Sequence, residues 1–465
     1  MGFVFYDTET TGTNLDFDQI LQFAAIRTDH DLVELDRFEI RCRLLPHVVP
    51  HPKALTVTRV SMDQLLDSSL PTHYEMMCQI AERLSAWSPA IFIGWNTLEF
   101  DEALLRQALF QCLHPPYLTN TDGNCRADLM KLAQALGLLQ PGVLQVPTGP
   151  NGKLTYKLDL LAPANGFNHS NAHDALADVE ATIHIGRIVR DAAGDHWSDA
   201  IRFSQKAAAS TFIDEEPAFL ITECYFGNAY QFALVKIAVD PDNPSSAICF
   251  DLDVNPDELQ TLSHDALVSR LGRKIKPIRR VRLNAAPILH ELSGLPSFHG
   301  APIPNLIARA EKIRSDQALC DRLVLAAKRA EREVSEHVEQ RIHGTFSGDA
   351  DKARMLQFHA SDWPSRAIIV ETFDDDRLIE LGRRLIFHHA PDALDASVRS
   401  EVEVTLARRV TGHGHVEPPW LTLAVADGDA VKQLAECNED EAAIVNGVRA
   451  YIAERLNQCA PHLAD

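Results

Sequence analysis

Residues 3–9 read Phe-Val-Phe-Tyr-Asp-Thr-Glu, an apolar run that ends in two acids. The run from Phe3 to Tyr6 is typical of a short buried strand. Because side chains alternate along an extended chain, Asp7 and Glu9 are expected on the same side, one strand step apart. Two carboxylates this close repel each other unless a cation lies between them. The motif alone leaves open a plainer interpretation, two solvated acids at the end of a strand.

Three further residues have the character of site residues. Asp101 stands in the first turn of an expected helix, where it could instead serve only as a helix cap. His173 and Asp178 are separated by four residues near the start of a later helix. Asp178 lies on an apolar face, where an unpaired acid is costly. His173 alone would be read as a capping or packing residue, but the set of four acids and a histidine indicates a catalytic site.

Two Mg²⁺ ions account for this set of residues. Hard cations prefer oxygen ligands, and two of them can hold both the attacking and the leaving oxygen of a phosphoryl transfer. Asp7, Glu9 and Asp178 are expected to be direct ligands, with Mn²⁺ as a substitute metal, and Asp101 binds directly or through water. Histidine titrates near neutral pH, so His173 is expected to take the proton of the attacking water.

The remaining pattern indicates a mixed α/β fold with more than one domain, as a length of 465 residues also suggests. The first two hundred residues alternate strands and helices, which favours a mixed sheet flanked by helices. Short β-rich runs between residues 218 and 252 indicate a small barrel or sandwich. The expected strands are 3–6, 20–27, 37–44 and 91–95, and the expected helices are 73–87, 98–113, 128–138, 172–190, 303–339, 350–358, 376–388 and 430–457.

Composition limits where the protein works. The nine cysteines are scattered, odd in number and without a CxxC pair, which argues against disulfides and zinc and favours the reducing cytoplasm. No run of eighteen apolar residues is present, so no membrane span is expected. The N-terminus has neither the basic region nor the cleavage site of a signal peptide.

The net charge of −21 argues against a polyanionic partner, unless a local positive surface exists. One dense basic cluster occurs around Arg279 and Arg280, and the family resemblance described below implies that it is a rim that faces DNA. The alternative is a solvated surface whose charges pair with the many acids of the chain. The cluster consists of Arg270, Arg273, Lys274, Lys276, Arg279, Arg280 and Arg282.

The pattern Asp7-x-Glu9, Asp101 and His173-x4-Asp178 resembles the DEDDh 3′→5′ exonucleases, which have a ribonuclease-H-like fold. The resemblance is strongest to the bacterial exodeoxyribonuclease I group, because of residues 22–29, 170–175 and 177–182. Weaker similarity to that group extends past residue 205. The resemblance implies three domains: an exonuclease domain at 1–195, a Src-homology-3-like barrel at 196–345 and a C-terminal helical domain at 346–465. In that group the last two domains close the DNA groove into a C shape.

The resemblance also implies a function and further site residues. It implies removal of deoxynucleoside 5′-monophosphates from single-stranded DNA, in repair and recombination, by a monomer that docks the single-stranded-DNA-binding protein. Arg106 and Tyr117 stand where the group contacts DNA, and Glu9 also touches substrate. Lys157 stands where the group usually has an arginine that binds phosphate, so the charge is kept but the bidentate fork is lost.

Three other functions fit parts of the pattern. An RNA-directed DEDDh exoribonuclease would use the same chemistry, but such enzymes lack the long C-terminal half. A non-catalytic binding module would be expected to have lost part of the acid set, which is intact here. A proofreading subunit of a polymerase would carry a polymerase-binding tail, and the sequence shows none.

Overall fold

The computed structural model describes residues 2–168, 173–225, 227–293, 295–330 and 333–463. Its first part is built on a mixed sheet, as the sequence predicts, and the strand order is β3-β2-β1-β4-β5. Central strand β1 pairs antiparallel with β2 and parallel with β4. The strands are β1 (Gly2–Thr10), β2 (Ile20–Thr28), β3 (Glu34–Arg41), β4 (Ala90–Gly94) and β5 (Cys125–Asp128).

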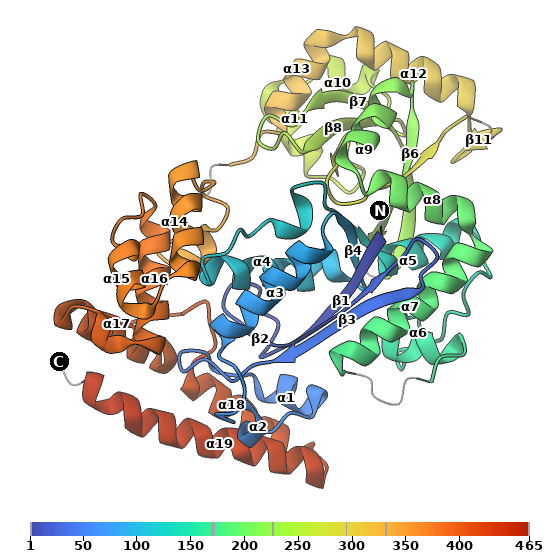
Figure 1. Cartoon of the computed structure of the whole chain (residues 1–465). Helices are drawn as coiled ribbons and strands as arrows, with labels where there is room; N and C mark the ends of the chain where they lie inside the picture. The colour runs from blue at the N-terminus through green and yellow to red at the C-terminus, as the bar shows by residue number, and fades with distance from the viewer. Residues whose placement is uncertain (1, 169–172, 226, 294, 331–332, 464–465) are drawn as a thin grey trace.

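Helices cover both faces of this sheet (Figure 1). Phe3 and Phe5 of β1 pack on one face, in a core shared with α5, α6, α7 and α8. Val4 and Tyr6 point to the other face, in a core shared with α3 and α4. The bounds are α3 (His73–Trp87), α4 (Asp101–Gln111), α5 (Leu129–Leu139), α6 (Leu158–Ala164), α7 (Ala175–Ala192) and α8 (Gly194–Phe203).

Several predicted bounds differ from the structure. Strand β1 runs on to Thr10, so Asp7 and Glu9 belong to the strand itself. The helix expected at 98–113 is a 3-10 turn, Thr97–Glu99, followed by α4 from Asp101. The last helix begins at Ala175, and residues 169–172, which include its predicted start, lie outside the described residues. Strand β5 and helix α6 were not predicted.

The predicted small β domain is an antiparallel sheet with the order β10-β6-β7-β8-β9. Both of its faces are buried: Phe219 and Val281 pack with α9 (Lys206–Glu215), and Leu220 and Phe250 pack with α12 and α13. The bounds are β6 (Phe219–Tyr225), β7 (Asn228–Val239), β8 (Ser246–Asp251), β9 (Ile278–Arg282), β10 (Ile288–Glu291), α10 (Asp257–Gln260), α11 (His264–Leu271), α12 (Ile303–Ser315) and α13 (Gln317–Ala326), with a short pair β11 (Ser297–Phe298) and β12 (Ala301–Pro302). The long helix predicted at 303–339 is therefore α12 and α13, and Asp316 caps the second of them.

The C-terminal helices return to the first sheet (Figure 1). Phe358, Val370 and Leu381 join the core beneath α3 and α4. Val448 and Ile452 join another core with Leu21 and residues near α1 (Pro52–Thr58) and α2 (Met62–Leu65). The bounds are α14 (Asp349–Ala360), α15 (Trp363–Val370), α16 (Asp376–His389), α17 (Ala396–Thr411), α18 (Leu423–Leu434) and α19 (Glu439–Cys459). Among the described residues, none of these helices is both long and apolar enough to cross a membrane.

Candidate active site

Three carboxylates meet where β1 faces the start of α7. Asp7 and Glu9 project from β1 on the side of Phe5, and Asp178 projects from the first turn of α7. One carboxylate oxygen from each lies within 4.8 Å of the other two. The prediction that Asp7 and Glu9 share a side, and that Asp178 joins them, agrees with this placement.

The electrostatics of these three acids call for a counter-charge. Burial, Asp178 and Asp101 together raise the pKa of Glu9 to about 9. Burial, and then the charges of Asp101 and Asp178, raise the pKa of Asp7 well above its ordinary value. Burial also raises the pKa of Asp178 to about 7, although the nearby His173 acts in the opposite direction. Oxygen donors that repel one another in this way fit a divalent hard cation.

Asp101 stands beside this group but is held separately. It is buried at the start of α4, and burial raises its pKa to about 7. Its Oδ1 accepts hydrogen bonds from the hydroxyl of Thr8 at 2.6 Å and from the N–H of Thr8 at 3.1 Å. Thr8 projects from the face of β1 opposite to Asp7 and Glu9, so Asp101 approaches the strand from the side of α4. Of its two predicted modes, this arrangement favours contact with a metal through water.

His173 lies immediately before α7, exposed and in the left-handed backbone region with φ of 68°. Asp174 caps the helix by accepting from the N–H of Ala177. The same Asp174 carboxylate accepts from the guanidinium of Arg41 at 2.6 Å and from Gln22 at 3.2 Å. The loop that carries His173 is thus anchored to β2 and β3. Arg41 and Asp174 were not predicted as site residues. The only sign of them in the sequence was the acid directly after His173.

Arg106 and Tyr117, predicted to contact DNA, lie together. The Arg106 guanidinium carbon stands 4.9 Å from the centre of the Tyr117 ring. Arg106 also donates to buried Glu102 at 2.8 Å, as does Arg126. Burial opposes ionisation of Glu102, but these two guanidiniums outweigh it and hold the pKa of Glu102 below its ordinary value. Arg106 is therefore fixed in place, with its charge shared with Glu102.

The pair opens into the largest cavity described, of about 1100 Å³. The cavity runs between the first sheet's α4, the second sheet and α14, so three parts of the chain form its walls. Phe346, 80% exposed, stands with its ring centre 5.5 Å from that of Tyr117. The residues that line the cavity include Arg106, Tyr117, Arg126, Arg282, Arg329, Phe346, Lys352 and Arg377.

Lys157 is exposed at the position that caps α6. Asp159, two residues further along the same helix, raises the pKa of Asp178. The start of α6 thus lies near the carboxylate group.

Arg279 and Arg280 differ from the predicted DNA rim. Both belong to β9, and their side chains are 15% and 26% exposed. Arg279 pairs with Asp251 at 2.9 Å and stands over the ring of Phe232, and Arg280 pairs with fully buried Asp240 at 2.8 Å. The alternative considered for this cluster, pairing with acids of the chain, describes these two residues better. Arg282 of the same strand is 57% exposed, lines the large cavity and pairs with half-exposed Glu99 at 3.0 Å.

Comparison with known proteins places this site in a family context. The family model described as Exonuclease matches residues 4–185. Exodeoxyribonuclease I of Escherichia coli K12 is 26% identical over 422 residues, which cover 84% of this chain and 86% of that protein. Exonuclease I of Methylocaldum szegediense superposes with a TM-score of 0.86 at 24% identity, covering 98% of this chain and 99% of that one. The zinc-bound complex of E. coli exonuclease I with single-stranded DNA superposes with a TM-score of 0.83 at 22% identity, and the match covers the same shares of the two chains. The chain is therefore a nuclease whose residues 4–185 match the exonuclease model and whose sequence resembles exodeoxyribonuclease I over most of its length.

Proposed function

We propose that this protein removes deoxynucleoside 5′-monophosphates from the 3′ end of single-stranded DNA. The observation that carries the proposal is the meeting of Asp7, Glu9 and Asp178 within 4.8 Å, with Asp101 and His173 alongside. Relatives named exodeoxyribonuclease I that match most of the chain support the substrate class.

Asp7, Glu9 and Asp178 would hold the divalent metal, with Asp101 acting through water. Two Mg²⁺ ions are proposed, with Mn²⁺ as a substitute, because all the donors are hard oxygen atoms. When bound, the metal supplies positive charge to the reacting phosphate and acidifies the attacking water.

The residues of the chain position the substrate and move the proton. His173 accepts the proton of the attacking water at an unprotonated ring nitrogen, and its exposed loop lets it reach the phosphate from the solvent side. Arg41 and Gln22 hold Asp174 and so keep that loop in place. Lys157 contributes charge toward the phosphate, without the two parallel hydrogen bonds that an arginine would give.

The large cavity suits a single strand better than a duplex. Tyr117 and exposed Phe346 offer ring faces on which unpaired bases can stack. Arg282, Arg329 and Lys352 line the same cavity and supply positive charge for the backbone in a protein whose net charge is −21. Stacking needs bases that are not already paired, so this wall favours single-stranded DNA.

A digestion assay tests the direction and the strand preference. A 5′-labelled hairpin with a 3′ overhang should lose its overhang one nucleotide at a time with Mg²⁺, stall at the duplex and stay intact with EDTA. Efficient loss of the duplex part would contradict the proposal. An RNA overhang of the same sequence, degraded as fast as the DNA, would favour the exoribonuclease alternative.

The basic residues of the cavity wall predict how binding of single-stranded DNA depends on salt concentration. Arg282→Ala should weaken binding of single-stranded DNA and reduce the slope of log affinity against log salt by about one. Arg279→Ala is the matched control from the same strand. It should leave the salt slope unchanged but lower the free energy of unfolding by about 3 kcal/mol, since it leaves buried Asp251 unpaired. Equal slopes for wild type and Arg282→Ala would show that DNA takes another path.

Further features remain proposals. We propose domains at 1–195, 196–345 and 346–465, noting that Val338 and Ile342 pack in the core with α14 to α16, which favours placing the second boundary before them. A monomer working in the cytoplasm, in repair and recombination and with the single-stranded-DNA-binding protein as partner, is proposed from the resemblance. Analytical ultracentrifugation and a pull-down with that protein's acidic tail test two of these points.

A further inference from the structure

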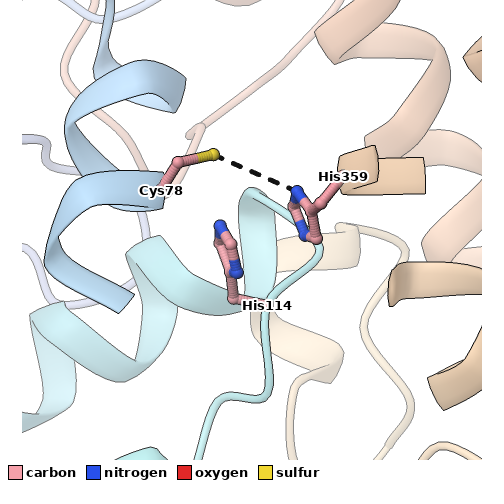
Figure 2. Close-up of side chains that lie close together, drawn as sticks. All are labelled: Cys78, His114 and His359. Carbon is pink, nitrogen blue, oxygen red and sulfur yellow. Dashed lines mark hydrogen bonds between the residues drawn. The ribbon is translucent and has the colours of Figure 1, made fainter. Parts of the chain in front are cut away.

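Cys78, His114 and His359 meet far from the carboxylates. Cys78 belongs to α3, His114 follows α4, and His359 belongs to α14, so three distant segments each contribute one side chain. One ligand atom from each lies within 4.8 Å of the other two. Figure 2 shows a ring nitrogen of His114 facing the space between the Cys78 sulfur and the His359 ring.

The hydrogen bonds leave His359 with an unprotonated nitrogen that accepts from the Tyr74 hydroxyl, and they leave His114 with a nitrogen that has no partner among the described residues. Nε2 of His359 lies 2.9 Å from the carbonyl oxygen of Leu113, so it carries the proton and donates. Its Nδ1 is then unprotonated, 4.0 Å from the Cys78 sulfur. His114 is only 8% exposed, and its Nε2 is buried without a hydrogen-bond partner in the described part of the chain. A buried orphan nitrogen of this kind indicates a missing partner.

The backbone orients one of the two imidazoles. The carbonyl of Leu113 orients the His359 ring from behind, an arrangement typical of metal-binding histidines.

We propose that Cys78, His114 and His359 bind one Zn²⁺ ion, with a fourth position open to water. Zn²⁺ prefers thiolate sulfur and imidazole nitrogen, and it takes four ligands in a tetrahedron. The catalytic carboxylates offer only oxygen, so the two sites select different metals. On binding, the Cys78 thiol releases its proton to solvent and the sulfur bonds to zinc as a thiolate.

The metal-free geometry needs only local adjustment. Tetrahedral bonds of about 2.0–2.3 Å place ligand atoms roughly 3.5 Å apart, so the three side chains must draw together slightly. The rings of His114 and His359 are stacked, with their centres 3.9 Å apart. On metal binding, one ring turns so that both lone pairs point to the metal. The Tyr74 hydroxyl, 2.9 Å from Nδ1 of His359, gives up that contact. His114 and His359 also line the large cavity, which gives zinc a path from solvent.

Zinc at this site ties α14 to α3 and to the end of α4. Of these elements, α14 and the end of α4 line the cavity that contains Tyr117 and Phe346. The site would therefore stiffen the wall without touching the reacting phosphate. It is a stabilising site, and the proposal stands whether or not the assigned nuclease activity is correct.

Metal content of the full-length protein tests the proposal. Protein is loaded with Zn²⁺, passed through a desalting column in excess Mg²⁺ to occupy the carboxylate site, and analysed for zinc by mass spectrometry. Wild type should retain one zinc per chain, and Asp7→Ala should retain the same amount. Cys78→Ser should lose at least tenfold in zinc affinity, as should His114→Gln. Cys437→Ser, a partly exposed free cysteine outside both metal-binding groups, is the matched control and should bind like wild type.

Two further readouts distinguish specific binding from a fold defect. Co²⁺ in place of Zn²⁺ should give a thiolate-to-metal absorption band and intense tetrahedral visible bands in wild type, both lost in Cys78→Ser. Saturating Zn²⁺ should raise the melting temperature of wild type and Cys437→Ser by about 3 °C and leave that of Cys78→Ser unchanged. All three proteins should melt together in EDTA. Equal zinc retention by Cys78→Ser and wild type, or no retention by either, would overturn the proposal.

Discussion

Asp7→Ala should lose cleavage of single-stranded DNA while keeping most of its affinity for the strand. Asp7 lies in the middle of the carboxylate group, where it faces both Glu9 and Asp178. Metal charge at a phosphoryl-transfer site contributes several kcal/mol to the transition state, which corresponds to a rate loss of about 10³-fold or more. Affinity for DNA comes from contacts along the cavity instead, chiefly with phosphates. Single-turnover rates and fluorescence anisotropy, both with Mg²⁺, measure the two effects separately.

Asp265→Ala, at an exposed acid on α11, is the control for loss of a negative charge. It should cleave like wild type. Wild-type rates from Asp7→Ala would remove the basis of the metal assignment, and a parallel loss of binding would mean that Asp7 contacts DNA rather than metal.

The raised pKa values of Asp7 and Glu9 also predict how stability in EDTA depends on pH. Because the folded-state pKa of Asp7 and of Glu9 is raised, the folded protein holds protons that the unfolded chain releases. The contribution of these two acids to stability should therefore be greatest below their unfolded pKa and fall as the pH rises from about 4.5 to about 9. Asp7→Asn should melt at a higher temperature than wild type at the upper end of that range. Mg²⁺ should reduce this difference, and thermal melts across pH would show it.

His173→Ala should lower the turnover rate by about 10²–10⁴-fold, the usual effect of removing a general base. Affinity for metal should hardly change, because His173 is not in the group of oxygen atoms that would bind it.

His30→Ala, whose side chain is 78% exposed in a loop, is the matched control and should behave like wild type in rate. Titration with Mn²⁺ measures metal affinity in each protein. A collapse of metal affinity in His173→Ala would make His173 a ligand rather than a base. Partial recovery of the rate with added imidazole would support its role in proton transfer.

The sequence is informative where local rules decide the structure. Alternation from Phe3 to Glu9 predicts the strand and the shared side of Asp7 and Glu9 because both depend only on neighbouring residues. Helix α3 is predicted with its exact bounds, and Thr72 and Glu75 form a capping box at its start. The set of site acids can be predicted from their spacing along strands and helices that the sequence pattern identifies clearly.

The sequence fails where distant partners decide the role of a residue. The string Ile-Arg-Arg-Val-Arg at 278–282 resembles a basic surface, yet it is strand β9, and two of its charges meet Asp251 at the end of β8 and Asp240 just after β7. Strand β5 escapes notice because Arg126 and Asp128 sit buried in it, paired or capping. Cys78, His114 and His359 share no motif, since three separate elements bring them together.

The core beneath β2 contains residues from both ends of the chain. Leu21, Leu44 and Leu55 pack there against Val448 and Ile452 of α19. During synthesis the N-terminal domain of a protein generally folds before the rest has been made. Here the nascent chain cannot complete that core until α19 has left the ribosome. The sheet that carries Asp7 and Glu9 thus gains the full support of this core only after α19 has been made.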